Sequence, residues 1–108
     1  MKTIILASEM TGCFTTISGL ALERAQGRNM LFVPTAARGE GWEPDYETDI
    51  LPFERLGFDV TVFDLADYGP GATERALEAA SFVFVSGGNT FHLLHHMKRS
   101  GFFDAVRR

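Results

Sequence analysis

Residues 81–97 read Ser-Phe-Val-Phe-Val-Ser-Gly-Gly-Asn-Thr-Phe-His-Leu-Leu-His-His-Met. The apolar run Phe82–Val85 is typical of a strand that is buried on both faces. Gly87 and Gly88 stop the run, and the residues behind them have the spacing of a helix. A turn of this kind exposes backbone amides beside the positive end of a helix, where a negative charge can be held.

Three more short apolar runs precede this one, and turn-forming residues bound each of them. They are Thr3–Ala7, Met30–Val33 and Val60–Phe63. Helices are expected at Thr15–Gln26, Pro44–Leu56, Thr73–Ala80 and Asn89–Arg99, with a further helical turn from Phe102 to Arg108. The alternation of strands and helices predicts an α/β domain with a parallel sheet and helices on both of its faces.

The expected helices and loops carry three further predictions. Pro52 lies inside the second helix and should kink or interrupt it. Thr73 is expected to cap the third helix. The two longest loops, Thr35–Glu43 and Asp64–Ala72, follow strand ends, which is where open α/β sheets place their sites.

The composition excludes several classes of protein. The 108 residues carry a formal net charge of −4, which argues against nucleic-acid binding because that requires a basic face. The apolar stretch Ile4–Ala7 is too short for a signal peptide, and no run approaches the length of a membrane span. Cys13 is the only cysteine, so an internal disulfide is excluded and a cytoplasmic location is expected. We interpret Cys13 as a packing or loop residue rather than a nucleophile.

The turn Ser86–Thr90 allows two interpretations from its residues alone. Gly87 and Gly88 let the backbone approach a ligand closely, and Asn89 or Thr90 can cap the following helix. The same residues suit a plain strand-to-helix turn. A dinucleotide fingerprint and a Walker lysine loop are absent. Ser86 lacks both a Gly-x-Ser-x-Gly setting and an obvious base, so no serine of this chain is predicted to be a nucleophile.

Three histidines follow the turn. His92 and His96 share a helix face, but Leu93 stands where a zinc-binding His-Glu-x-x-His motif has glutamate, so no metal site is predicted. The simplest interpretation is a partly exposed helix whose Phe91, Leu94 and Met97 face the core. A substrate contact from His92 stays open because this residue is close to the turn.

The loop after the second strand contains an aromatic pair and a charged side chain. Trp42 and Tyr46 could line a pocket or attach the loop to the following helix, and the residues favour neither role. Arg38 is expected to pair with Glu40, with an acidic substrate as the alternative partner.

Several of these segments resemble the peptidase E (aspartyl dipeptidase) family of serine peptidases, which is related to cyanophycinase. The segment Val85–Leu94 is similar to the Gly-Gly-Asn-Thr-Phe-x-Leu-Leu motif of that family. Weaker likenesses are Phe32–Ala36, the pair Trp42 and Tyr46, and Leu56–Val60. The spacing of the segments also agrees, so the resemblance covers essentially all 108 residues.

The resemblance implies a three-layer α/β/α, flavodoxin-like fold akin to class I glutamine amidotransferases, of which this chain would hold about four strands. It also implies a chain of about half the family's length, so residues 1–108 would form one incomplete domain whose nucleophilic serine lies beyond Arg108. The Gly88 amide would bind the oxyanion, Gly87 would permit the approach, and Asn89 and Thr90 would shape the substrate-binding floor of the site and cap the helix; the substrate contact considered for His92 rests on its position near the turn. Small peptides, with Asp-X dipeptides suggested by the family, would be the substrates, and no metal or organic cofactor is implied.

The absence of the second half has a structural consequence in this scheme. Phe82–Val85 would become an unpaired apolar edge, which the missing half, another chain or a second copy of this chain would cover. Two alternative functions stay open. One is a non-enzymatic α/β module that binds a small anion or a protein partner at the Gly-Gly turn. The other is a relative of the amidotransferases with Cys13 as nucleophile, although Cys13 lies earlier in the chain than that class requires.

Overall fold

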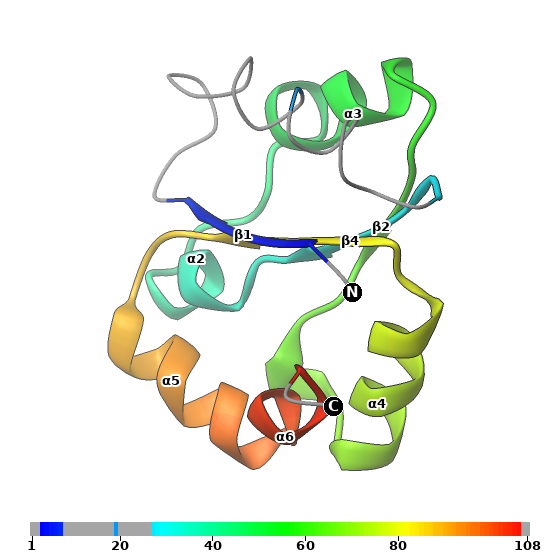
Figure 1. Ribbon diagram of the computed structural model, residues 1–108. Helices are drawn as coiled ribbons and strands as arrows, with labels where there is room; N and C mark the ends of the chain where they lie inside the picture. Colours follow the sequence, from blue (N-terminus) through cyan, green and yellow to red (C-terminus); the bar gives the residue numbers. More distant parts are fainter. Residues whose placement is uncertain (1–2, 8–18, 20–26, 107–108) are drawn as a thin grey trace.

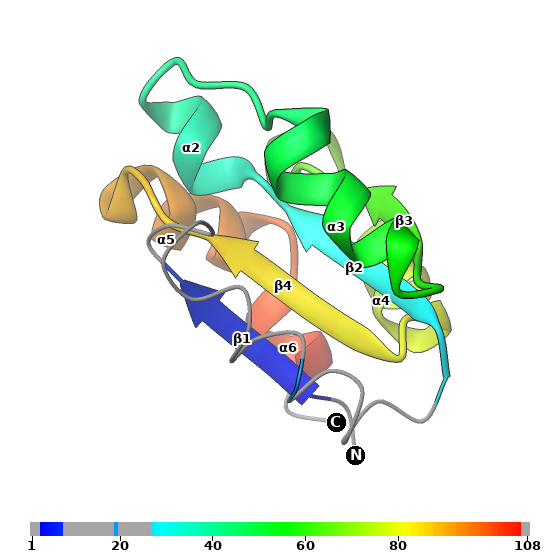
Figure 2. The ribbon, with the colours of Figure 1, turned by 90° about the horizontal axis from the view of Figure 1, so that it is seen from above.

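A computed structural model of the chain describes residues 3–7, 19 and 27–106. It contains a four-stranded parallel sheet in the order β1-β4-β2-β3 (Figures 1 and 2). The strands are β1 (Thr3–Ala7), β2 (Asn29–Val33), β3 (Asp59–Val62) and β4 (Phe82–Ser86). Each of the four apolar runs therefore forms a strand, as the sequence predicts.

Helices cover both faces of this sheet. Figure 1 shows α3 on one face and α2, α4, α5 and α6 on the other, so the α/β/α layering is confirmed. The helical elements are α2 (Thr35–Gly39), the π-helical turn η1 (Tyr46–Ile50), α3 (Leu51–Arg55), the 3-10 turn η2 (Leu65–Asp67), α4 (Pro70–Ala79), α5 (Thr90–Arg99) and α6 (Phe102–Val106). No helix among the described residues is both long and apolar enough to cross a membrane. Most of the helix expected at Thr15–Gln26, and Cys13 with it, lie outside the described residues.

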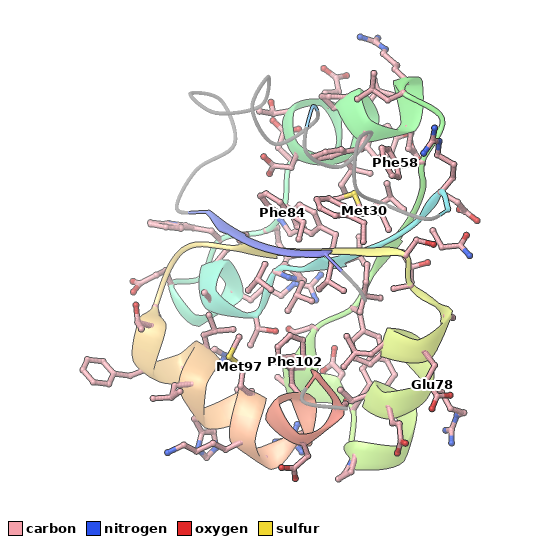
Figure 3. The ribbon with its side chains drawn as sticks, viewed as in Figure 1. Met30, Phe58, Glu78, Phe84, Met97 and Phe102 are labelled. Atoms are coloured by element: carbon pink, nitrogen blue, oxygen red, sulfur yellow. The ribbon has the colours of Figure 1, made fainter. Side chains whose placement is uncertain are left out.

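The two faces of the central strands build two cores, because successive strand residues point to opposite sides of a sheet. On the α3 face, aromatic side chains dominate, and the rings of Phe32 and Phe84 stack with centroids 5.3 Å apart. On the other face, aliphatic strand residues pack against the longer helices. Figure 3 shows Met30, Phe58 and Phe84 on the first side and Met97 and Phe102 on the second.

The expectations for the helices are met in part. The helix expected at Pro44–Leu56 changes type without a break, since the π-helical turn η1 ends at Ile50 and α3 begins at the next residue, Leu51, beside Pro52. Proline lacks the N–H that would continue the preceding hydrogen-bond ladder, which accounts for a change of helix type at this point, but the predicted kink or interruption is not seen as a gap between the two elements.

The third helix begins earlier than predicted. Gly69 is its N-cap and Pro70 its first residue, a position that suits proline because its missing N–H would have no helical partner. Thr73 is therefore not the cap but lies buried in the first turn. The two predicted loops also contain short helical elements, α2 and η2, the second of which is capped by the side chain of Asp64.

The expectation of an unpaired edge at Phe82–Val85 is wrong. Strand β4 pairs with β1 on one side, in the register Ile5 to Phe84, and with β2 on the other, in the register Phe32 to Phe84. The chain thus brings its first strand back beside its last, a non-local pairing that the local pattern does not encode. The outer strands of the described sheet are β1 and β3.

Candidate functional site

The Gly-Gly turn lies at the carboxyl end of β4, where parallel sheets place their sites. Gly88 is exposed and has a φ of +149°, a conformation that side-chain-bearing residues rarely adopt. A Cβ on Gly88 would lie 2.3 Å from the carbonyl oxygen of Ala36 in α2. The turn therefore admits only glycine at this position, and its backbone rests directly on the first turn of α2.

Asn89 joins this turn to the helix behind it. Its side-chain oxygen accepts a hydrogen bond from the backbone N–H of His92 at 2.9 Å, so Asn89 is the N-cap of α5. Its own backbone N–H donates to the Ala36 carbonyl oxygen at 2.8 Å. Of the two residues predicted to cap the helix, Asn89 is the N-cap, and Thr90 is the exposed first residue of α5.

The N–H of Gly88 makes no hydrogen bond to another residue in the described part of the chain. It precedes the N-terminus of a ten-residue helix, whose dipole favours negative charge at that end. Gly87, between Gly88 and the strand, is half-buried, and the Ser86 hydroxyl donates to the Val33 carbonyl oxygen at 3.4 Å. Gly88 is thus an exposed residue that precedes the positive end of α5, and its N–H has no acceptor among the described residues.

His92 lies one turn further along α5, between that helix and α2. Its ring atoms would be 2.7 Å from a Cβ built on Gly39, so the imidazole occupies the space that this glycine leaves. The rings of His92 and His96 make an edge contact with centroids 4.5 Å apart. Among the residues that the structure describes, no group of three or more His, Cys, Asp or Glu side chains is placed to hold a metal ion.

The orientation expected for α5 is wrong for Phe91 and Leu94 and right for Met97. Phe91 is 86% exposed and Leu94 is 41% exposed, whereas Met97 is buried and Leu93 packs against the core. Leu93 and Met97 are four residues apart and share one helix face, and Phe91, two residues earlier than Leu93, points away from that face. Two alternative apolar stripes exist in this sequence, and the stripe of Leu93 and Met97 is the one that faces the core.

A buried polar network next to the turn was not anticipated from the sequence. The hydroxyl of Thr35 donates to Asp64 Oδ1 at 2.8 Å and accepts from the Leu65 N–H at 2.9 Å. The Ala66 N–H also donates to Asp64 Oδ1, at 3.0 Å, and Arg38 donates to Oδ2 at 3.3 Å. Burial raises the pKa of Asp64, but the hydrogen bonds from Ala66, Thr35 and Arg38 outweigh it and hold the pKa below its ordinary value.

One sequence signal could have revealed this network. Thr35 and Asp64 each come two residues after the end of a strand, and β2 and β3 are neighbours in the sheet. The carboxyl ends of adjacent parallel strands meet at the same edge, so polar residues at these two positions are brought together.

Arg38 was expected to pair with Glu40, but it pairs instead with Glu43, at 3.0 Å, and with Asp64, at 3.3 Å. The reason is a reversal of the chain after α2. Gly41 has a φ of +82°, and the Trp42 N–H donates back to the Ala37 carbonyl oxygen, which brings Glu43 beside Arg38.

The aromatic pair of this loop is exposed, Trp42 by 60% and Tyr46 by 53%. The hydroxyl of Tyr46 donates to the carboxylate of Glu54 in α3. Tyr46 thus attaches the loop to the following helix, which is one of the two roles predicted for the pair.

A hollow of about 280 Å³ lies away from the turn, between the amino end of β2 and the carboxyl end of α4. It is lined mainly by small and apolar residues, among them Leu31, Ala76 and Ala80. This hollow belongs to the other end of the strands and has no part in the site at Gly88.

The fold and the turn together define a class: a three-layer α/β/α domain with a glycine turn and an exposed amide at the carboxyl end of an inner parallel strand. The sequence model of peptidase family S51 matches residues 4–108. The chain therefore belongs to peptidase family S51, which confirms the resemblance to peptidase E.

Individual relatives agree with this assignment. An uncharacterised peptidase of Listeria monocytogenes is 37% identical over 76 residues, which cover 70% of this chain and 37% of that protein. Peptidase E of Shigella flexneri is 35% identical over 95 residues, or 82% of this chain and 39% of that protein. The crystal structure of a putative peptidase E protein from Listeria monocytogenes matches with a TM-score of 0.79 and 30% identity over 99% of this chain and 52% of that one. The chain thus spans about half the length of these relatives, or less.

Proposed function

We propose that the chain is the N-terminal portion of a serine-type peptidase that hydrolyses small peptides through an acyl-enzyme. In this proposal the nucleophilic serine comes from polypeptide outside these 108 residues, and the Gly88 amide donates a hydrogen bond to the oxyanion. The observation that carries it is the exposed Gly88 N–H, which precedes α5 and has no acceptor among the described residues of a chain from a peptidase family.

The chemistry of acyl transfer requires such a group. When a hydroxyl attacks a peptide carbonyl, negative charge develops on the carbonyl oxygen, and a fixed N–H aimed at that oxygen stabilises the transition state. Because the Gly88 backbone is held against Ala36, the donor is already in place before substrate arrives. Removing one donor of this type typically lowers kcat by about 10²–10³-fold.

We further propose Asp-X dipeptides as substrates, with Asn89, Thr90 and His92 as contacts beside the scissile bond and the cytoplasm as the location. No metal or organic cofactor enters this scheme. The alternative of a non-enzymatic binding module rests on the same amide, but it does not account for membership of a peptidase family.

The test uses the product of the native gene at its natural length. We expect it to release the aniline from aspartyl p-nitroanilide and to leave alanyl p-nitroanilide, the matched control, largely intact. A fluorophosphonate probe should label a single serine outside residues 1–108, as found by peptide mapping. Absence of both hydrolysis and labelling would reject the peptidase, and hydrolysis of both anilides alike would reject only the aspartyl preference.

A further inference from the structure

The Gly88 turn rests on a single peptide group of α2. The Ala36 carbonyl oxygen accepts the Asn89 N–H at 2.8 Å, and the same oxygen would lie 2.3 Å from a Cβ on Gly88. Both residues of the turn therefore touch the Ala36 peptide. Because the next residue, Asn89, is hydrogen-bonded to Ala36 and the Gly88 backbone leaves no room for a side chain against it, we expect a displacement of Ala36 to shift the Gly88 N–H.

Thr35, the residue before Ala36, is fully buried and anchored through its hydroxyl. The hydroxyl accepts from the Leu65 N–H, so its own proton is directed to the Asp64 carboxylate. This chain of two hydrogen bonds ties the start of α2 to the residues that follow β3.

Asp64 is itself held from several directions. The Ala66 N–H shares Oδ1 with Thr35, and Arg38, one turn along α2, binds Oδ2. The carboxylate therefore contacts α2 at two points, Thr35 and Arg38, which fixes the helix against rotation about its axis as well as against translation.

The far end of α5 completes the arrangement. An Nη atom of Arg99 donates to the carbonyl oxygens of Leu65 at 2.7 Å, Ala66 at 3.0 Å and Tyr68 at 3.1 Å. Helix α5 is thus joined to the residues after β3 directly at its C-terminus, and through Ala36 and Thr35 at its N-terminus. The hydrogen bonds therefore form a closed circuit from the start of α5 to α2, from α2 to the residues after β3, and from these back to the end of α5.

We infer that Thr35 and Asp64 are positioning residues for the Gly88 amide, an inference that rests on the proposed function of that amide. Among the described residues neither side chain makes a hydrogen bond to the turn at 86–90, so both act through the Ala36 peptide. A hydrogen-bond donor in an oxyanion site must lie within a few tenths of an ångström of its productive place, and a misplacement of about 1 Å can lower the rate by about 100-fold.

The kinetic test compares Thr35→Val, Thr35→Ser and Asp64→Asn in the native-length protein. Valine keeps the shape of threonine and removes the hydroxyl, so we expect kcat to fall at least about tenfold while KM changes less than about threefold, as for an interaction made in the transition state. Asp64→Asn should act in the same direction, and Thr35→Ser should restore most of kcat. The matched control is Leu77→Ala, a buried truncation in α4 that should lower stability without this change in kcat.

A second measurement needs no activity. Amide hydrogen exchange at Asn89, read by NMR or mass spectrometry on the same native-length proteins, should accelerate in Thr35→Val and Asp64→Asn more than in Leu77→Ala. If exchange and kcat in the Thr35 and Asp64 variants match those of the Leu77 control, the positioning role is overturned. If exchange at Asn89 responds as expected but the wild-type protein hydrolyses no peptide, the proposed function is wrong. The inference that Thr35 and Asp64 position the Gly88 turn is then still supported.

Discussion

At the scale of the single residue, Gly88 is the position with the least freedom to change. Replacement by alanine would combine a φ of +149° with a Cβ only 2.3 Å from a backbone oxygen, which no rotamer change can relieve. We expect Gly88→Ala to lower the free energy of unfolding by about 2 kcal/mol or more, since strained backbone alone costs about 1–3 kcal/mol. Urea denaturation of the native-length protein measures this difference.

The matched control is Gly71→Ala, because this glycine lies in α4 with an ordinary φ and a Cβ there would meet only Arg75 Nη1, at an ordinary contact distance of 3.5 Å. Alanine there should stabilise the protein by about 0.5–1 kcal/mol, since helical glycine is entropically costly. Equal effects of the two substitutions would show that the contact between Gly88 and Ala36 does not exist in solution.

The lowered pKa of Asp64 predicts that the free energy of unfolding depends on pH. Its pKa is lowered in the folded protein, so the unfolded chain binds its proton more readily, and the stabilising contribution is complete above the ordinary carboxyl pKa of about 4. That contribution is lost as the pH falls through the ordinary value towards the lowered one. The difference in free energy of unfolding between wild type and Asp64→Asn should therefore be constant from neutral pH to about pH 5 and shrink below about pH 4.

The measurement is a series of urea unfolding curves of both proteins at closely spaced pH values. A difference that stays constant down to the acid limit would contradict the ionised, hydrogen-bonded state of Asp64. A difference that vanishes already near neutral pH would show that its pKa is raised instead.

At the scale of the element, the start of α5 depends on one side chain. Asn89→Ala removes the acceptor of the His92 N–H while leaving the backbone hydrogen bond to Ala36 in place. We expect a loss of about 1 kcal/mol, the usual value for an N-cap, and near-complete recovery in Asn89→Ser. Thermal unfolding checks this, with Asn29→Ala as control, because the exposed Asn29 side chain makes only a 3.3 Å hydrogen bond to Ala79.

The elements also show what the sequence could predict and why the rest was missed. The four strands and most of α5 follow from local patterns, because buried strands need uninterrupted apolar runs and helices need caps and stops. The pairing of β4 with β1 is non-local, and nothing in residues 82–86 specifies their neighbour. The Thr35–Asp64 network lies in two segments that are 29 positions apart and meet only once β2 and β3 pair. The local pattern predicts the wrong face for Phe91 because two apolar stripes compete in α5.

At the scale of the whole molecule, the two outer strands of the described sheet differ. Three of the four β3 residues are exposed, and its sequence Asp-Val-Thr-Val mixes polar and apolar side chains. The sequence of β1, Thr-Ile-Ile-Leu-Ala, is apolar almost throughout. An apolar outer strand is the feature that recruits further strands, whereas polar and charged residues discourage them. We therefore propose that the free edge of β1, rather than β4, is where additional polypeptide joins the sheet.

This proposal predicts how the 108 residues behave by themselves. Expressed alone, they should elute as assemblies whose size grows with concentration, and co-expression with the remainder of the native gene product should convert them into a one-to-one complex. Light scattering coupled to size-exclusion chromatography measures both states. Val62→Lys, which places a charge on the half-exposed outer strand β3, should leave the assemblies unchanged if β1 is the strand that recruits them. If Val62→Lys dissociates the assemblies, the edge that joins further polypeptide is β3 and not β1. If the 108 residues are a stable monomer at every concentration, neither edge recruits a partner.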